Sequence, residues 1–169
     1  YYNVNLEYNF PFRIPKPVLG TPARTRVVVA ARSGEISDFQ VEAQGQFLGN
    51  ISLESTNLSQ YTSTYAYENS GIWSFEGSSG DIVLTLSYLR PDVNSEGWLN
   101  NISLNARSEL NMQGVSQLMF RDMESTGLCS VVTYILSNTG NAIIWDITDP
   151  TVPLNIPWTR SGQDATFTL

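Results

Sequence analysis

The sequence predicts an all-β fold, a β-sandwich that could be a jelly roll, with about ten to twelve short strands and little helix. Three observations support this prediction. Apolar and polar residues alternate with a period of two in many short segments, and turn residues separate these segments. No window carries the apolar stripe of a long helix. Charged residues make up only 15% of the 169 residues, and aromatic residues 11%.

The N-terminal elements follow from alternation and from proline. Residues 2–8 alternate apolar and polar side chains, which predicts a strand with one wet face. Residues 10–22 contain four prolines, and because proline has no amide hydrogen they predict a loop or an extended edge strand. Residues 26–32 read Arg-Val-Val-Val-Ala-Ala-Arg. This run is apolar on both faces, which is typical of a central strand.

The remaining elements are short strands separated by turns. Gln44-Gly45 lies between residues 36–43 and 46–53, and this arrangement predicts a hairpin. Residues 131–136 are apolar on both sides and predict a second central strand within the strand 128–137. The other predicted strands cover residues 62–67, 72–75, 81–89, 98–104, 117–122, 142–148 and 166–169.

We expect one domain and a short exit segment. The chain shows no internal repeat or charge block, so a single β-sandwich domain over residues 1–150 is the simplest division. Three prolines follow in residues 150–157. Residues 151–169 therefore form either a proline-containing exit segment or a last strand.

The composition excludes several functions. The chain has no histidine, which removes Ser-His-Asp and Cys-His catalysis and histidine-ligated zinc. The single cysteine, Cys129, lies in an apolar run and is expected to be a buried small hydrophobe. The net charge of −7 argues against a nucleic-acid partner. No apolar run reaches the length of a membrane helix, so we expect no direct membrane insertion.

One segment resembles the opening of a calcium loop. Asp92, Asn94 and Glu96 supply oxygen side chains at alternate positions, and Gly97 follows. The twelfth position, which should be a bidentate Glu, is Ser103. We therefore expect a polar turn and no cofactor, with a weak calcium site as the alternative.

Asp146 and Asp149 form a second polar candidate, near the end of a predicted strand. Two carboxylates could cleave a glycosidic bond, which would make the chain a small glycosidase. A structural role fits better, with Asp146 binding backbone amides or an arginine and Asp149 shaping the turn into Pro150. Arg121 is the candidate partner of Asp146.

Four segments together resemble a known family. They are Val27-Val-Val-Ala-Ala-Arg-Ser33, Gly97-Trp-Leu-Asn-Asn-Ile-Ser-Leu-Asn-Ala-Arg107, Met119-Phe-Arg-Asp122 and Ile144-Trp-Asp-Ile-Thr-Asp-Pro150. Their order and spacing resemble the β-rich region before the gingipain-type cysteine peptidase domain of type IX secretion sortases of Bacteroidetes. The matching positions are Trp98, Arg107, Phe120, Arg121, Trp145, Asp146 and Asp149.

The resemblance implies a non-catalytic accessory domain. The parent protein would lie at the outer-membrane surface, remove C-terminal sorting domains from cargo and attach the cargo to lipopolysaccharide. Its catalytic Cys and His would lie outside this chain, so the matching residues imply scaffold or docking roles. The implied partners are the adjacent peptidase domain and other secretion components or cargo. The alternative is a carbohydrate-binding or adhesin-like β-sandwich of a secreted bacterial protein, in which some of the four tryptophans and eight tyrosines form a sugar-stacking surface.

Overall fold

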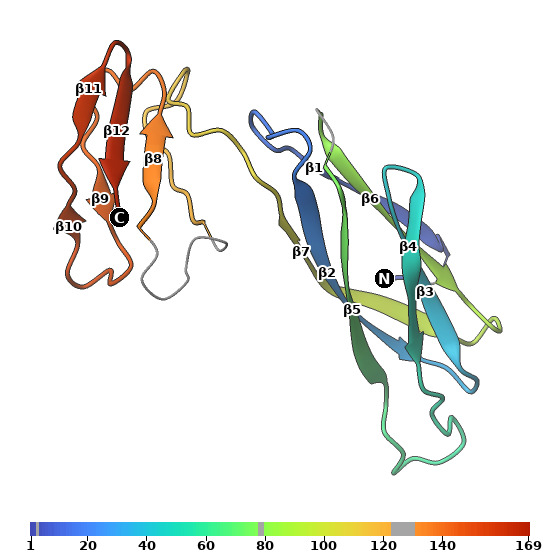
Figure 1. Cartoon of the computed structure of the whole chain (residues 1–169). Helices are drawn as coiled ribbons and strands as arrows, with labels where there is room; N and C mark the ends of the chain where they lie inside the picture. Colours follow the sequence, from blue (N-terminus) through green and yellow to red (C-terminus); the bar gives the residue numbers. More distant parts are fainter. Residues whose placement is uncertain (3, 78–79, 123–130) are drawn as a thin grey trace. The chain divides into compact units, whose positions relative to one another are not determined.

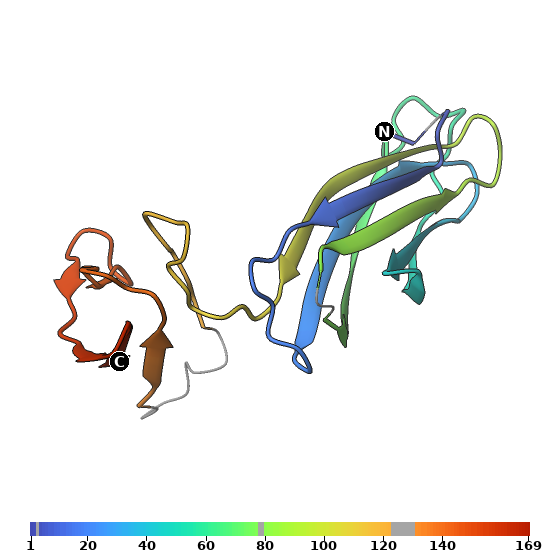
Figure 2. The ribbon, with the colours of Figure 1, turned by 90° about the horizontal axis from the view of Figure 1, so that it is seen from above.

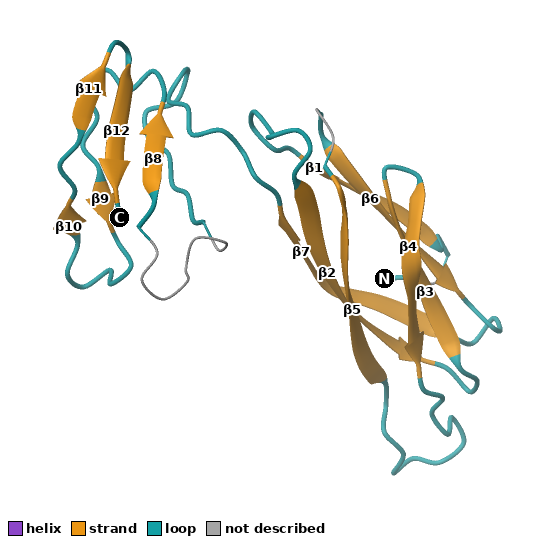
Figure 3. Ribbon diagram, in the orientation of Figure 1, coloured by secondary structure: helices purple, strands orange, loops and turns teal. Residues whose placement is uncertain are grey.

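The computed structural model describes residues 1–2, 4–77, 80–122 and 131–169 (Figure 1). Every regular element in this part of the chain is a β-strand, as Figure 3 shows, so the all-β prediction is confirmed. The chain divides into two compact units, Tyr1–Ser108 (unit 1) and Glu109–Leu169 (unit 2). The prediction for Cys129 lies outside the described residues.

Unit 1 is a sandwich of two antiparallel sheets, which lie face to face (Figure 1). One sheet has the strand order β1-β6-β3-β4, and the other has the order β5-β2-β7. The strands are β1 (Glu7–Phe12), β2 (Pro22–Arg32), β3 (Ser37–Ala43), β4 (Gln46–Leu53), β5 (Tyr67–Glu76), β6 (Ile82–Leu89) and β7 (Glu96–Asn105).

Two predictions for unit 1 are confirmed in detail. β2 is the central strand of its sheet and pairs with β5 and β7 along its length. β3 and β4 form a hairpin through Gln44 and Gly45, whose φ angles are 53° and 74°. Two successive left-handed residues are the backbone that a two-residue hairpin turn requires. Residues 62–66, however, form a loop before β5, although they were predicted to be a strand.

The core of unit 1 lies between the two sheets. Val27 and Val29 of β2 meet Phe39 and Val41 of β3 and Leu86 of β6, and all five side chains are fully buried. The strands supply these residues at alternate positions because successive side chains of a strand point to opposite faces. A second cluster, which includes Phe75 and Leu84, continues the core toward the other end of the sandwich.

β1 forms an outer edge of the four-stranded sheet, beside β6 in Figure 2. The carbonyl of Leu6 accepts a hydrogen bond from the Tyr88 amide at 2.8 Å. In an antiparallel ladder the backbone groups of every second residue point toward the neighbouring strand. Since Leu6 points toward β6, the even-numbered residues of β1 do so too, and Pro11 has its nitrogen on the side away from β6. Residues 10–22 thus give the end of an edge strand and a loop, as their prolines predicted.

Unit 2 is a smaller assembly of short strands. Its sheets have the orders β11-β12-β8 and β10-β9. The strands are β8 (Thr133–Leu136), β9 (Trp145–Asp146), β10 (Leu154–Asn155), β11 (Thr159–Ser161) and β12 (Asp164–Thr168). Leu136, Ile144, Ala165 and Phe167 form a core separate from that of unit 1.

Two strand predictions in unit 2 are wrong. Residues 117–122 form no strand, although Leu118 packs against the core. β8 lies at the edge of its sheet, whereas residues 131–136 were predicted to be central. The apolar residues on the outer face of this segment, Val131 and Ile135, are exposed. In this segment, therefore, a run that is apolar on both faces has one face exposed and is not buried on both.

The two compact units also divide the chain at a different place from the predicted domain. The prediction set one sandwich over residues 1–150, whereas the sandwich occupies Tyr1–Ser108. The segment 151–169 contains three short strands, β10, β11 and β12, that belong to unit 2. The prolines of this segment, Pro153 and Pro157, lie between strands, the first before β10 and the second before β11.

Tyr2 offers a test of the core of unit 1. Its ring is buried against Phe39, with ring centroids 5.1 Å apart, and its hydroxyl finds no partner among the described residues. We expect Tyr2→Phe to raise the free energy of unfolding at neutral pH by about 1 kcal/mol, because an unsatisfied buried hydroxyl is costly. Urea denaturation measures this change, with Tyr61→Phe, at a fully exposed tyrosine, as the control.

The same variant should alter stability at alkaline pH. Burial, with a smaller contribution from Tyr8, raises the pKa of Tyr2 above its usual value. The folded state then holds this proton more tightly than the unfolded chain, so this contribution to stability is present below about pH 10 and is lost above it. Tyr2→Phe should therefore lose less stability between neutral and strongly alkaline pH than the unchanged chain does. An equal loss of stability in the variant and in the unchanged chain would contradict the raised pKa of Tyr2.

Candidate docking surface

A row of exposed apolar side chains runs along β9 and its flanking residues. Ile143, Trp145 and Ile147 lie at alternate positions, and each is more than half exposed. Ile144, between them, is buried in the core of unit 2. We call Ile143, Trp145 and Ile147 the β9 row. Exposed apolar side chains gathered in one place, unlike scattered ones, are typical of a contact surface.

The backbone around β9 fixes this row. β10 pairs with β9 so that Asn155 lies opposite Trp145 and Leu154 opposite Asp146. The amide of Ile156 then donates to the carbonyl of Ile144 at 2.9 Å, which continues the pairing. Because the segment is extended, its odd-numbered side chains share one face, and burial of Ile144 turns that face outward.

Asp146 and Asp149 shape the turns that follow the row. The Asp146 carboxylate accepts hydrogen bonds from the amide and the hydroxyl of Thr148, at 2.9 and 2.7 Å. Asp149 binds Thr151 in the same way, at 2.9 and 2.6 Å. In each case the threonine hydroxyl, and then its amide, lowers the pKa of the aspartate. Asp146 therefore binds a local threonine and not the predicted partner, Arg121.

Phe120 and Arg121 lie beside the core of unit 2. The ring of Phe120 packs against Tyr134 and Phe167, with centroids 5.4 and 6.3 Å apart, yet this side chain remains 41% exposed. Arg121 is exposed. A groove of unit 2 is lined by Phe120, Arg121 and Tyr134 and by all three residues of the β9 row. Four of the seven predicted positions, Phe120, Arg121, Trp145 and Asp146, thus line one groove.

Trp98 and Arg107 belong to unit 1. Trp98 lies on β7, where its ring stacks on Tyr1 at 5.7 Å. Arg107 follows β7, and its carbonyl accepts a hydrogen bond from the amide of Val18 at 3.0 Å. These two positions therefore do not share a unit with the β9 row.

The calcium candidate is a capped turn. The Asp92 carboxylate accepts from the Asn94 amide at 2.6 Å and from the Ser95 hydroxyl at 2.8 Å. Glu96 accepts from the hydroxyl of Tyr1 at 2.7 Å. In the described part of the chain no three His, Cys, Asp or Glu side chains come together in a way that could hold a metal ion. Asp92 and Glu96 are thus engaged with protein donors.

Asp92→Asn tests whether the Asp92 carboxylate stabilises the turn through its hydrogen bonds to Asn94 and Ser95. The Asn94 amide, followed by the Ser95 hydroxyl, lowers the pKa of Asp92. A lowered pKa stabilises the fold above the pKa of the unfolded chain, and this contribution is lost as the pH falls below it. The melting temperature of the variant should be lower at pH 7, with the deficit shrinking toward about pH 3.

Two comparisons accompany that measurement. The control is Glu54→Gln, which changes the same charge at an exposed residue and should leave the melting temperature unchanged. Millimolar calcium should also leave the melting temperature of the unchanged chain where it is. A calcium-dependent rise that Asp92→Asn abolishes would support the calcium alternative instead.

Sequence reasoning found Trp145 but missed its neighbours. Ile143 and Ile147 share the odd-numbered positions with Trp145, and Ile144 lies on the opposite face, but the sequence does not say which of the two faces is buried. Large apolar residues at the three alternate positions 143, 145 and 147, one of them a tryptophan, are the signal that could have indicated a contact surface.

The chain is all-β in the part that the structure describes and has two units, the second of which exposes the three apolar side chains of the β9 row. Its fold is that of a region of PorU: the crystal structure of dimeric latent PorU from Porphyromonas gingivalis matches 98% of this chain with a TM-score of 0.81. The two sequences are 11% identical over the match, and the chain spans 16% of the PorU chain. The structural similarity includes both units, since nearly the whole chain is covered.

The other comparisons found a weaker structural match and no sequence match. A carbohydrate-binding module, CBM36, in complex with calcium and xylotriose matches 59% of this chain and 71% of its own, with 10% identity and a TM-score of 0.34. No protein-family model and no curated protein sequence matches the chain. Among the described residues, no helix has both the length and the apolar character needed to cross a membrane.

Proposed function

We propose that this chain is a non-catalytic accessory region of a larger cell-surface sortase with a gingipain-type cysteine peptidase domain. The observation that carries the proposal is the match to PorU over 98% of this chain. The order and spacing of the four sequence segments, which resemble the β-rich region of such sortases, support it independently. The chain would support and orient the peptidase domain by surface contact, since it contains no histidine for a Cys-His pair.

The β9 row is the proposed contact with the peptidase domain. Three large apolar side chains exposed together would be desolvated by a partner, and a tryptophan among them is typical of residues that dominate binding energy. The groove that they line with Phe120 could receive complementary side chains. In the parent protein, this contact would hold the peptidase at the cell surface while it removes C-terminal sorting domains from cargo and attaches the cargo to lipopolysaccharide.

The gene itself provides the first test. The proposal expects a gingipain-type domain, with its own catalytic Cys and His, in the same reading frame as this chain. A reading frame that encodes no such domain would overturn the proposal.

A binding measurement tests the contact surface. The isolated peptidase domain from that reading frame is titrated with this chain by calorimetry. We expect Trp145→Ala to weaken binding about 30-fold, equivalent to about 2 kcal/mol, as for a central interface residue. Ile135→Ala is the matched control, since Ile135 is an equally exposed apolar residue on β8, outside the β9 row and its groove. Equal weakening by both variants, or no effect of Trp145→Ala, would contradict this surface.

A further inference from the structure

An aromatic cluster lies on the outer face of the β5-β2-β7 sheet of unit 1. The ring of Trp98 stacks on Tyr1, with centroids 5.7 Å apart and planes 28° apart, and lies tilted against Tyr65 at 6.4 Å and 39°. The Arg32 guanidinium lies over the ring of Tyr65 at 5.0 Å. Tyr1 and Tyr65 are each more than half exposed. Trp98 contacts both tyrosine rings, and we call the rings of Tyr1, Tyr65 and Trp98 the aromatic surface.

The backbone holds this aromatic surface in place. The amide of Tyr2 donates to the Gly97 carbonyl at 2.8 Å, which ties the segment that bears Tyr1 to β7. The hydroxyl of Tyr1 donates to Glu96 at 2.7 Å. Trp98 lies on β7 opposite Ala30 of β2. Pairing with β7 thus fixes the backbone that bears Tyr1 and Trp98, and Tyr65 reaches Trp98 from the loop before β5.

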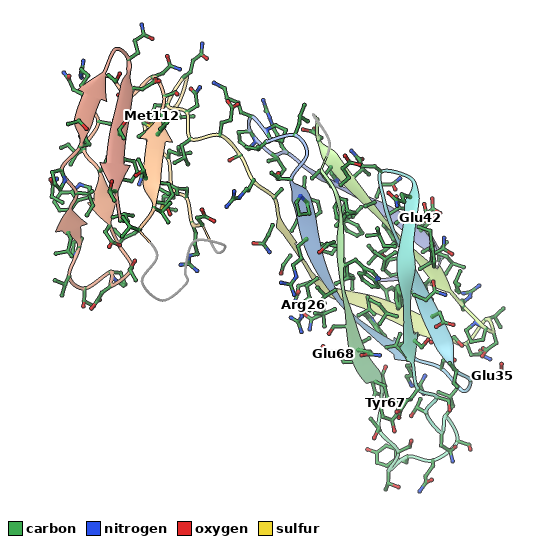
Figure 4. The ribbon with its side chains drawn as sticks, in the orientation of Figure 1. Arg26, Glu35, Glu42, Tyr67, Glu68 and Met112 are labelled. Atoms are coloured by element: carbon green, nitrogen blue, oxygen red, sulfur yellow. The ribbon has the colours of Figure 1, made fainter. Side chains whose placement is uncertain are left out.

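Polar groups border the aromatic surface. The pairing of β2 with β7 shifts between Val28 and Val29, which leaves Asn100 as an extra residue in β7. A bulge of this kind redirects a side chain. Here the Asn100 amide donates to the Glu68 carboxylate of β5 at 2.8 Å. Glu68, labelled in Figure 4, is opposite Ala30, which is also the partner of Trp98, so this pair and the ring lie at one level of the sheet.

We infer that this surface binds a neutral oligosaccharide of pyranose units with equatorial hydroxyls. Such sugars present flat C–H faces that stack on aromatic rings, whose faces carry partial negative charge. Their hydroxyls both donate and accept hydrogen bonds, which suits the Glu68 carboxylate, the Asn100 amide and the Arg32 guanidinium. Two carboxylates, Glu68 and Glu96, accompany one guanidinium at the site, so the local charge disfavours an anionic ligand.

A saccharide fits this surface better than a protein does. The neighbours of Trp98 across the sheet are Ala30 and Glu68, and the next outward position on β5 is Ser70. Larger aliphatic side chains on this face begin further along the sheet, with Val28, which is buried, and Ile72, which is half exposed. Rings bordered by hydrogen-bonding groups are typical of a small-ligand site, which needs a few placed polar groups beside an apolar floor.

This inference does not depend on the proposed docking function, because its residues lie on unit 1 and the β9 row lies on unit 2. The experiment uses the whole chain and three probes: cellohexaose, xylohexaose and chitohexaose. We expect at least one of them to bind saturably with a dissociation constant near or below about 1 mM. Binding should also change the tryptophan fluorescence.

Two variants and a control locate the site. Tyr65→Ala removes an exposed ring from the loop before β5 and should weaken binding at least about tenfold, equivalent to about 1.4 kcal/mol. Tyr61→Ala removes a fully exposed tyrosine from the same loop, for which no ring contact is found among the described residues, and should leave binding unchanged. Trp98→Ala should abolish the binding and most of the fluorescence change, with circular dichroism confirming that the chain remains folded.

Two outcomes would overturn the inference. One is the absence of saturable binding to all three hexasaccharides. The other is binding that Tyr65→Ala leaves intact or that Tyr61→Ala weakens equally. Neither result would affect the proposed contact through the β9 row, which is measured with the peptidase domain.

Discussion

Phe39→Ala is expected to destabilise unit 1 by about 3–5 kcal/mol, as for other fully buried aromatic residues. The ring of Phe39 is completely buried at the centre of the sandwich. It contacts Tyr2 edge-on at 5.1 Å and stacks on Tyr88 at 4.7 Å. Removing it would leave a cavity bounded by rigid strands of both sheets, which cannot close without breaking the ladders. Chemical denaturation followed by circular dichroism measures the loss.

Phe47→Ala is the matched control. Phe47 lies on the neighbouring strand β4 and is 57% exposed, so its removal deletes the same number of atoms without opening the core. Its effect should stay within about 0.5 kcal/mol. Similar losses in the two variants would contradict the position of the core between the two sheets.

Gly97→Ala is expected to cost about 3 kcal/mol, at the upper end of the range for overpacked cores. A Cβ atom at this position would lie 2.7 Å from the Phe39 ring and 3.1 Å from the Tyr88 ring. Both rings are buried and stack on each other, so neither can move aside without disturbing the other. The same unfolding measurement applies.

Gly80→Ala provides the comparison for that substitution. Among the described residues, and apart from its chain neighbours, no atom lies within 4 Å of the position that its Cβ would occupy, so added volume is tolerated there. We expect its free energy of unfolding to stay close to that of the unchanged chain. A neutral Gly97→Ala would show that β7 does not approach the two rings as closely as the structure indicates.

The sequence predicted unit 1 well because its strands obey simple rules. In β3 and β6 the apolar side chains alternate regularly, and each strand has one face on the core. In β2 the apolar run is central as expected, because it is paired on both sides and its inner residues are fully buried. The turn at Gln44 and Gly45 followed from the need for two left-handed residues.

Unit 2 was predicted less well, and the physical reason is its small size. Its strands have two to five residues, too few for alternation to identify. A small unit also leaves apolar residues exposed, as at Ile135 and Ile143, so an apolar run no longer indicates burial on both faces. The boundary after Ser108 has no proline near it, and the two charged residues that flank it, Arg107 and Glu109, do not form a charge block, which is why one domain was expected over residues 1–150.

The two candidate surfaces differ in how much of each could be predicted from the sequence. Trp145 was found because it belongs to a distinctive local segment. The aromatic surface on unit 1 could not be predicted, since Tyr1, Tyr65 and Trp98 meet only through the pairing of distant strands. The bulge that directs Asn100 toward Glu68 likewise depends on register, which a single sequence does not reveal.

The proline in β1 has a consequence for association between molecules. Strand edges with free amides can recruit further strands from other chains and so seed aggregates. At Pro11, the fifth of the six residues of β1, the outward-facing nitrogen carries no hydrogen, so a foreign strand docking there would miss one bond near the end of its contact. The sandwich thereby protects an otherwise open border against fibre-like growth, without an additional element to cover it.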